Sequence, residues 1–123
     1  MPSLLVIDDE LEVTGYLKEY FQAHGLEVSV ATTGEDGLAL LTSENPPNLA
    51  LLDLKLGSGI SGLEVLRRAK VAKTKAQIIV VTAVDDRNVA EMAKGFGAVD
   101  YITKPFSLEE LDRVVLSRLK SEH

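Results

Sequence analysis

The chain has 123 residues, 46% of them hydrophobic, and a formal net charge of −6, which fits one globular domain with a sizeable core. The lack of cysteine excludes disulfides and thiolate metal sites, and the acidity disfavours nucleic-acid binding by this domain, because neutralising phosphates needs clustered Lys and Arg. No apolar run approaches the roughly 20 residues that span a bilayer, and no secretory pattern is present, so we expect a cytoplasmic protein without membrane contact.

The first part of the chain predicts a strand, a helix and a second strand. Leu4–Ile7 and Leu26–Val30 are short apolar runs without polar alternation, which is typical of strands covered on both faces. The segment between them has helical periodicity and a stop signal at Gly25. The apolar face of this predicted helix consists of Leu11, Leu17, Tyr20 and Phe21.

Three further strand-like runs follow, and helical patterns precede and separate them. Thr33 can cap a helix that ends before the segment Asn45–Pro47, because proline cannot continue a helix. The strand-like runs are Leu49–Leu52, Ile78–Val81 and Val99–Ile102. The helices after them have N-terminal signals at Ser61–Glu64, at Asp85 or Asp86, and at Ser107–Glu110. The last helix places on one face Leu108, Leu111, Val115 and Leu119.

Strands that alternate five times with helices predict an α/β fold, a doubly wound five-stranded parallel sheet with right-handed crossovers and helices on both faces. We expect residues 1–123 to form one such domain. In these sheets, ligands bind beyond the carboxyl ends of the strands. In a flavodoxin-like (βα)5 fold with strand order 2-1-3-4-5, strands one, three, four and five are neighbours, so the residues that follow them meet at one edge.

Polar side chains follow four of the predicted strands. They are Asp8, Asp9 and Glu10 after the first strand, Asp53 after the third, Thr82 after the fourth and Lys104 after the fifth. Each type alone has an ordinary structural explanation, such as helix capping for an acid or strand propensity for threonine. Their combination is far more specific, because no structural need places acids at two adjacent strand ends and a lysine at the next.

The combination of these residues favours phosphoryl chemistry with a divalent cation. Carboxylates held close together raise one another's pKa, and Mg²⁺, which prefers oxygen ligands, relieves that repulsion. Asp8 and Asp9 are therefore predicted to form half of a Mg²⁺ site that Asp53 completes. An ionised aspartate is also a nucleophile toward phosphorus. Asp53 is then the candidate acceptor, and the Thr82 hydroxyl and the Lys104 ammonium would contact the phosphoryl oxygens.

The segments LLVIDDE, LLDLKL, VVTA and GAVDYITKPF together resemble the receiver domain of two-component response regulators, the CheY-like family. The resemblance implies that a phosphoryl group passes from the phosphohistidine of a sensor histidine kinase or phosphotransfer protein to Asp53. It also implies that Asp9 and Asp53 bind Mg²⁺ directly, Asp8 through water, and Lys55 through its backbone carbonyl. The domain would catalyse only its own phosphorylation and dephosphorylation, without a separate substrate.

The resemblance further implies a conformational switch. Thr82 and Lys104 would bind the phosphoryl group, and Tyr101 would change rotamer on activation. The fourth helix, the fifth strand and the fifth helix would then present a surface to an output domain or a partner protein. The peptide bond between Lys104 and Pro105 is expected to be cis.

The loop GSGISG, Gly57–Gly62, departs from the family pattern and raises an alternative; we call it the glycine loop. Receivers often carry proline four residues after the phosphoacceptor and glycine eight after it, whereas here Gly57 takes the first position and Gly62 lies nine residues after Asp53. The loop also matches G-x-G-x-x-G, so a dinucleotide site is a rival interpretation, although Asp53 would repel a pyrophosphate. A phosphorylation-independent interaction module on the same fold is another alternative, which the complete set of site residues disfavours.

Overall fold

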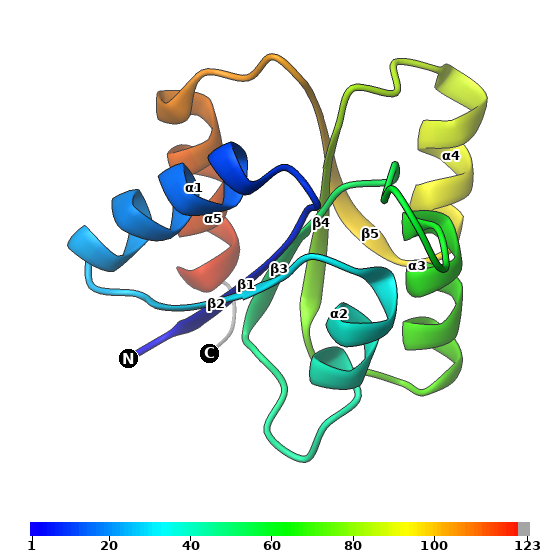
Figure 1. Ribbon diagram of the computed structural model, residues 1–123, viewed down its shortest axis with the longest axis horizontal. Helices are drawn as coiled ribbons and strands as arrows, with labels where there is room; N and C mark the ends of the chain where they lie inside the picture. The colour runs from blue at the N-terminus through cyan, green and yellow to red at the C-terminus, as the bar shows by residue number, and fades with distance from the viewer. Residues whose placement is uncertain (121–123) are drawn as a thin grey trace.

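The computed structural model describes residues 1–120, and its centre is a five-stranded sheet (Figure 1). The strands are β1 (Ser3–Ile7), β2 (Glu27–Ala31), β3 (Leu49–Leu52), β4 (Gln77–Thr82) and β5 (Ala98–Thr103). Their order is β2-β1-β3-β4-β5, and every neighbouring pair is parallel. The predicted fold class and strand order are therefore confirmed, and the observed strands differ from the predicted runs by about one residue at their ends.

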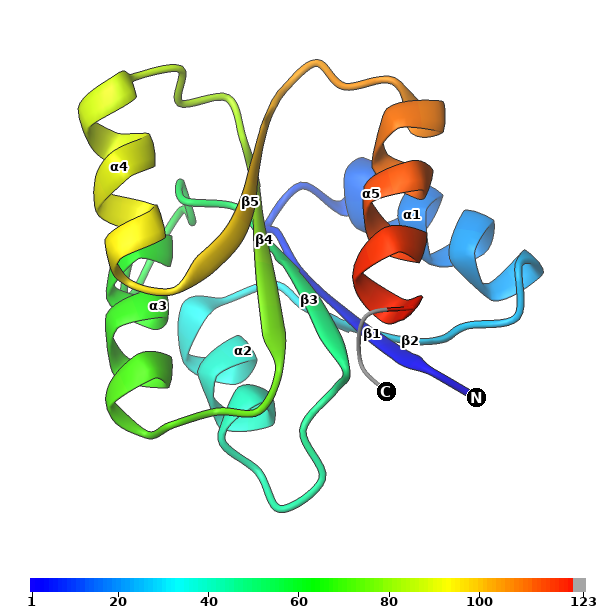
Figure 2. The ribbon, with the colours of Figure 1, turned by 180° about the vertical axis from the view of Figure 1, so that it is seen from behind.

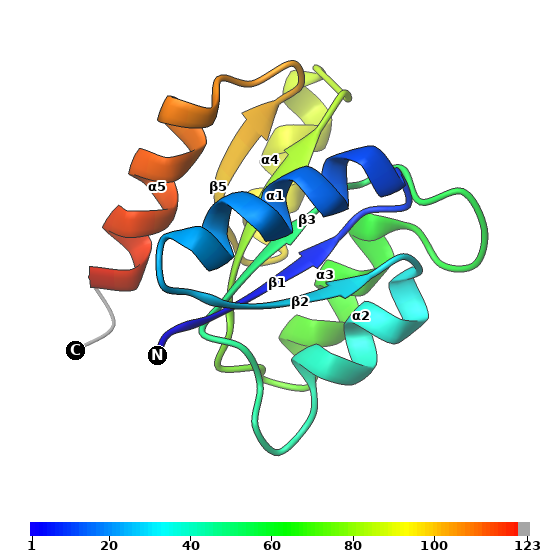
Figure 3. The same cartoon turned by 60° about the vertical axis from the view of Figure 1, so that its left-hand side comes forward.

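Helices cover both faces of the sheet, as Figures 1 and 2 show from opposite sides. One face carries α1 (Leu11–Ala23) and α5 (Leu108–Lys120). The other face carries α2 (Gly34–Leu41), α3 (Gly62–Val71) and α4 (Arg87–Gly95). Figure 3 shows α1 and α5 on one side of the strands and α2 and α3 on the other. No helix within residues 1–120 combines the length and the apolarity required to cross a bilayer.

Successive residues of β1 face opposite layers of the protein. Leu4 and Val6 belong to the apolar cluster under α1 and α5, whereas Leu5 and Ile7 belong to the cluster under α2, α3 and α4. Because both faces of the strand are buried, its sequence shows no alternation with polar residues. The helices contribute to these two clusters the buried residues Leu17, Phe21, Leu41, Val65, Leu66, Ala69, Ala93, Leu111 and Val115.

The helix boundaries follow local signals in the sequence. Four side chains cap helix N-termini by accepting from an amide two or three residues later, and these are Thr33, Ser61, Asp86 and Ser107. At the end of α1, Gly25 has the left-handed φ of 87° that glycine adopts readily, and the Leu26 N–H donates to the Phe21 carbonyl. This pattern is a Schellman motif, as the predicted stop at Gly25 requires.

The predicted apolar face of α1 is wrong at Leu11. Its side chain is 72% exposed, whereas Leu17 and Phe21 of the same helix are buried. Leu11 is the first residue of α1, so it lies at the carboxyl edge of the sheet and not over its strands.

Candidate functional site

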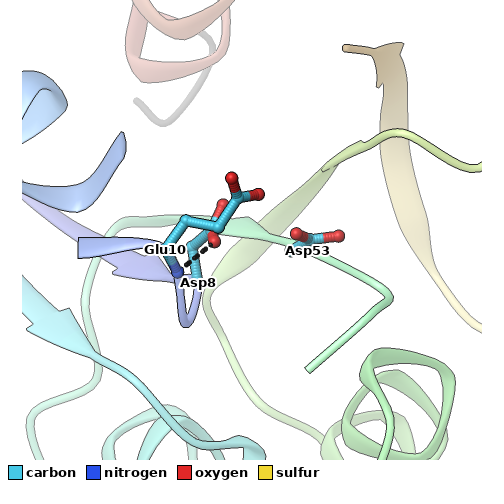
Figure 4. A group of neighbouring side chains, drawn as sticks. All are labelled: Asp8, Glu10 and Asp53. Atoms are coloured by element: carbon cyan, nitrogen blue, oxygen red, sulfur yellow. Dashed lines mark hydrogen bonds between the residues drawn. The ribbon is translucent and has the colours of Figure 1, made fainter. Parts of the chain in front are cut away.

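Asp8 and Asp53 lie side by side at the carboxyl edge of the sheet. Each is the first residue after its strand, and β1 and β3 are neighbours with Ile7 paired to Leu52. Both aspartates are buried, at 4% exposure each. Glu10 brings a third carboxylate to the same place, and one oxygen of each group lies within 4.8 Å of the others (Figure 4). The parallel topology thus concentrates negative charge at one point of the sheet edge.

A turn at Asp8 accounts for the position of Glu10. The Glu10 N–H donates to Oδ1 of Asp8 at 2.9 Å, drawn as a dashed line in Figure 4. Asp8 and Glu10, two residues apart, therefore direct their carboxylates toward the same space. Burial raises the pKa of the Asp8 carboxyl above its ordinary value, the bonds from Lys104 and from the Glu10 N–H oppose this rise, and the neighbouring Asp53 adds to it.

Lys104 is the cation at the centre of these carboxylates. Its Nζ lies 2.8 Å from Asp8 Oδ2, 3.0 Å from Glu10 Oε1 and 3.1 Å from Asp53 Oδ2. Burial alone would lower the pKa of the ammonium, but the hydrogen bonds to the three carboxylates outweigh it and raise that pKa above its ordinary value. Lys104 is therefore charged at neutral pH, and with all three carboxylates ionised the cluster keeps an excess of negative charge.

The other carboxylate oxygen of Asp53, Oδ1, accepts hydrogen bonds from Thr82 and Lys55. Thr82, the last residue of β4, is fully buried, and its Oγ1 donates to Asp53 Oδ1 at 2.7 Å. The Lys55 N–H donates to the same oxygen at 3.1 Å. Lys104 is connected to Thr82 as well, because its backbone N–H donates to the Thr82 carbonyl at 2.8 Å. The strand ends thus fix the plane of the Asp53 carboxylate.

Asp9 does not join the other carboxylates. It is exposed, and its Oδ2 accepts a hydrogen bond of 2.8 Å from the N–H of Gly57 in the glycine loop. Within residues 1–120, the group of carboxylates that could share an ion consists of Asp8, Glu10 and Asp53. Of the predicted metal ligands, the structure therefore brings Asp8 and Asp53 together and directs Asp9 toward the loop.

Two site residues were missed by the sequence reasoning. Glu10 is among the acids that follow the first predicted strand, but the sequence pattern assigns it no role beyond helix capping, although α1 begins without a side-chain cap from Glu10; the spacing of two from Asp8 is the available signal. Gly62 is predicted as part of the glycine loop and of a helix start, without a role in positioning Asp53. A Cβ on Gly62 would lie 2.5 Å from the Cα of Leu54 and would also meet the Asp53 carbonyl. The start of α3 thus packs directly against the backbone that carries Asp53.

Tyr101 lies on β5 beside this site, and its hydroxyl donates to the backbone carbonyl of Val84, in the loop between β4 and α4. β5 pairs Thr103 with Thr82, so Tyr101 and the site residue Thr82 are connected through adjacent strands. The Lys104–Pro105 peptide is cis, as expected. Tyr101 is partly exposed, and its ring packs against the apolar cluster under α2, α3 and α4.

Two amides of the glycine loop donate to acids. Gly57 donates to Asp9, and the Ile60 N–H donates to Glu35 Oε2 at 3.0 Å. A dinucleotide pyrophosphate needs such amides free and needs an environment without carboxylates. The arrangement therefore disfavours the dinucleotide interpretation of GSGISG.

The oxygen donors at the sheet edge suit a hard divalent cation. Mg²⁺ usually takes one or two carboxylates and keeps several waters, and Asp8 and Asp53 offer two buried carboxylates at adjacent strand ends. Their shared negative charge is only partly neutralised by Lys104. The residues present therefore fit Mg²⁺.

The comparisons with known proteins agree with this geometry. The family model described as the response regulator receiver domain matches residues 4–116. Sporulation initiation phosphotransferase F of Bacillus subtilis (strain 168) is 32% identical over 108 residues, which cover 88% of this chain and 86% of that protein. The chain spans about half the length, 46% and 54%, of other curated relatives that it matches.

Solved structures show the same fold. A CheY-like response regulator receiver domain protein from Methanospirillum hungatei JF-1 matches with a TM-score of 0.90 at 29% identity, covering 98% of this chain and 94% of that one. The response regulator TrrA of Thermotoga maritima, solved in complex with Mg²⁺–BeF, matches with a TM-score of 0.83 at 35% identity, covering 96% of this chain and 99% of that one.

Proposed function

Because the chain belongs to the response regulator receiver domain family of two-component systems, we propose that it accepts a phosphoryl group on Asp53 and changes conformation in response. The observation that carries this proposal is the environment of the Asp53 carboxylate. It is buried at the sheet edge, within hydrogen-bond distance of both the Thr82 hydroxyl and the Lys104 ammonium. The proposed donor is the phosphohistidine of a sensor histidine kinase or of a phosphotransfer protein.

In the proposed step, a carboxylate oxygen of Asp53 attacks phosphorus while the bond from phosphorus to the imidazole nitrogen of the donor breaks. The imidazole leaves with the electron pair, and Asp53 becomes an aspartyl phosphate. Lys104 supplies positive charge to the transferred oxygens, and the Thr82 hydroxyl donates to one of them. Attack by water later releases phosphate and restores Asp53, which is the only turnover we propose.

Mg²⁺ is the proposed cofactor, and when bound it would neutralise the charge that phosphoryl transfer concentrates at the site. Asp9 and Asp53 are the proposed direct ligands, with Asp8 acting through water and Lys55 through its carbonyl. The buried carboxylates of Asp8 and Asp53 support Mg²⁺ as the cofactor at this edge of the sheet, and a related response regulator, TrrA, was solved in complex with Mg²⁺–BeF. Glu10 contributes by holding Lys104.

The proposed output lies on the α4–β5–α5 face. The phosphoryl group on Asp53 would carry about −1.5 to −2 charge in place of the single charge of the carboxylate, which would draw the Thr82 hydroxyl toward the new oxygens. Tyr101, connected to Thr82 through adjacent strands and to the β4–α4 loop through Val84, would then change position. An output domain or partner protein would read the altered face.

Labelling with a small phosphodonor tests the proposal. Wild-type protein incubated with acetyl phosphate and Mg²⁺ should gain the mass of one phosphoryl group, and Asp53→Asn should gain none. Asp85→Asn, which alters an exposed acid in the β4–α4 loop, is the matched control and should be labelled like the wild type. Equal labelling of Asp53→Asn and wild type would refute the assignment. Absence of labelling in every variant would favour the phosphorylation-independent interaction module.

A further inference from the structure

We propose that the glycine loop is a latch that holds Asp9 away from the Mg²⁺ site, and that Glu35 of α2 fastens this latch. Binding of Mg²⁺ would then require the latch to open, so that Glu35 sets the metal affinity from outside the site. The inference rests on the proposed function, because it concerns how this chain's own residues reach the Mg²⁺ position.

The first contact of the latch occupies Asp9. Its Oδ2 accepts from the Gly57 N–H at 2.8 Å, and Asp9 lies outside the group of carboxylates whose oxygens approach within 4.8 Å of one another. To join the ion position shared by Asp8 and Asp53, the Asp9 carboxylate must therefore move from this place, and the hydrogen bond from Gly57 resists that movement. The bond to the loop thus competes with the bond to the metal.

The second contact of the latch joins the loop to α2 through Ile60 and Glu35. Glu35 Oε2 accepts from the Ile60 N–H at 3.0 Å. The Ile60 side chain rests directly on Gly34, where a Cβ would lie 2.7 Å from Ile60 Cγ1. Gly59, between these contacts, has a φ of 78°, and a side chain there would collide with the Glu35 carboxylate. The loop thus follows the N-terminus of α2 closely and presents Gly57 to Asp9.

The two contacts are coupled because a few residues of one loop connect them. Loss of the Glu35 bond frees Ile60, which loosens the loop and weakens the hold of Gly57 on Asp9. By linkage, whatever destabilises the latched form favours Mg²⁺ binding to the same extent. The contacts are exposed, so one hydrogen bond of this kind corresponds to a change in Mg²⁺ affinity of about two- to fivefold.

Two pairs of variants separate the latch from general effects of charge. Glu35→Ala removes the acceptor for Ile60, and Asp36→Ala is its control, because Asp36 lies in the same first turn of α2 and loses the same charge. Gly57→Ala changes no charge, but its Cβ would lie 2.7 Å from Asp9 Oδ2 and would displace that carboxylate. Gly15→Ala, where a Cβ meets nothing within 4 Å, is the control for this substitution.

Mg²⁺ affinity by titration calorimetry and amide hydrogen exchange by NMR are the two measurements. Without metal, Glu35→Ala should speed exchange at both Ile60 and Gly57, whereas Asp36→Ala should leave both unchanged. Mg²⁺ should speed exchange at Gly57 in the wild type. Glu35→Ala should bind Mg²⁺ about two- to fivefold more tightly than Asp36→Ala, and Gly57→Ala should bind more tightly than Gly15→Ala.

The outcomes distinguish the latch from the metal site itself. If the wild type binds Mg²⁺ but the Gly57 amide stays equally protected, or if Glu35→Ala and Asp36→Ala bind Mg²⁺ equally, the latch is overturned while the proposed metal site stands. If no protein in the set binds Mg²⁺ saturably, the proposed metal site fails, and the latch fails with it.

Discussion

Replacing Lys104 with methionine should strongly destabilise the metal-free protein, and Mg²⁺ should restore much of the loss. Methionine keeps an unbranched apolar stem that reaches the ε position, as in lysine, but lacks the ammonium. Asp8, Glu10 and Asp53 would then face one another with no cation between them. Because Asp8 and Asp53 are buried, water would screen their repulsion poorly.

The size of the effect follows from the geometry. At separations near 3 Å, each ammonium–carboxylate attraction is about 5 kcal/mol at an effective dielectric constant of ~20, before desolvation is counted. Removing one partner of a buried pair costs about 3–5 kcal/mol. The Lys104 side chain is 14% exposed and the Glu10 side chain is 59% exposed. Because water reaches part of the cluster, we expect a cost at the lower end of this range. A loss of about 3 kcal/mol in a chain of this length lowers the melting temperature by about 12 °C.

Thermal and urea unfolding at pH 7, with chelator and then with Mg²⁺, measure this loss. Lys55→Met removes an exposed neighbouring lysine and should change the melting temperature little. In an Asp8→Asn background, Lys104→Met should cost less, with a coupling of about 1.5–3 kcal/mol. A coupling below about 0.5 kcal/mol would refute the reasoning, because it lies within the scatter of independent sites.

The contribution of Lys104 to the stability of the folded protein should depend on pH in a defined direction. The pKa of Lys104 is raised in the folded protein, so its stabilisation is fully present below the unfolded lysine pKa of about 10.4. That stabilisation is lost as the pH rises toward the folded pKa. The difference in stability between wild type and Lys104→Met should therefore be constant from pH 7 to about pH 10 and shrink above it.

Three further substitutions test other parts of the structure. Gly62→Ala should lower the free energy of unfolding by about 2–3 kcal/mol, because its Cβ meets the backbone of Asp53 and Leu54; urea unfolding that matches wild type would contradict this packing. Asp8→Asn should melt higher than wild type without metal at pH 7. Since the pKa of Asp8 is raised, the advantage should shrink as the pH falls toward the unfolded pKa of about 3.9 and vanish below about pH 3, where both unfolded and folded Asp8 are protonated. Lys104→Ala should still bind beryllofluoride, a phosphoryl mimic, but at saturation its amide chemical-shift changes in α4 and β5 should be smaller than those of wild type. Changes equal to those of wild type would leave Lys104 only a charge neutraliser.

The fold was predictable because its determinants are local. The strands are short runs buried on both faces, and the caps at Thr33, Ser61 and Ser107 depend on residues three positions away. The meeting of Asp8 with Asp53 was predictable too, because parallel topology alone brings the ends of neighbouring strands together.

The orientation of the adjacent acids was not predictable in the same way. Glu10 turns inward and Asp9 outward because of a turn at Asp8 and a hydrogen bond to Gly57, which is 48 positions further along the chain. The long-range bond depends on where the glycine loop lies, and periodicity contains no information about that. Leu11 shows the same limit, because helical periodicity predicts on which face of the helix a residue lies but not whether the sheet extends beneath that residue.

The division of β1 between two apolar layers has a consequence for how the protein comes apart. Val6 and Ile7 are adjacent in sequence but belong to separate clusters, so β1 cannot detach without opening both. Loss of a helix from one layer leaves the opposite layer covered, whereas loss of β1 or β3 opens both layers, so we expect these two strands to be lost only in global unfolding. Because Asp8 and Asp53 are the residues that follow these two strands, we expect the site to be attached to the part of the molecule that unfolds last.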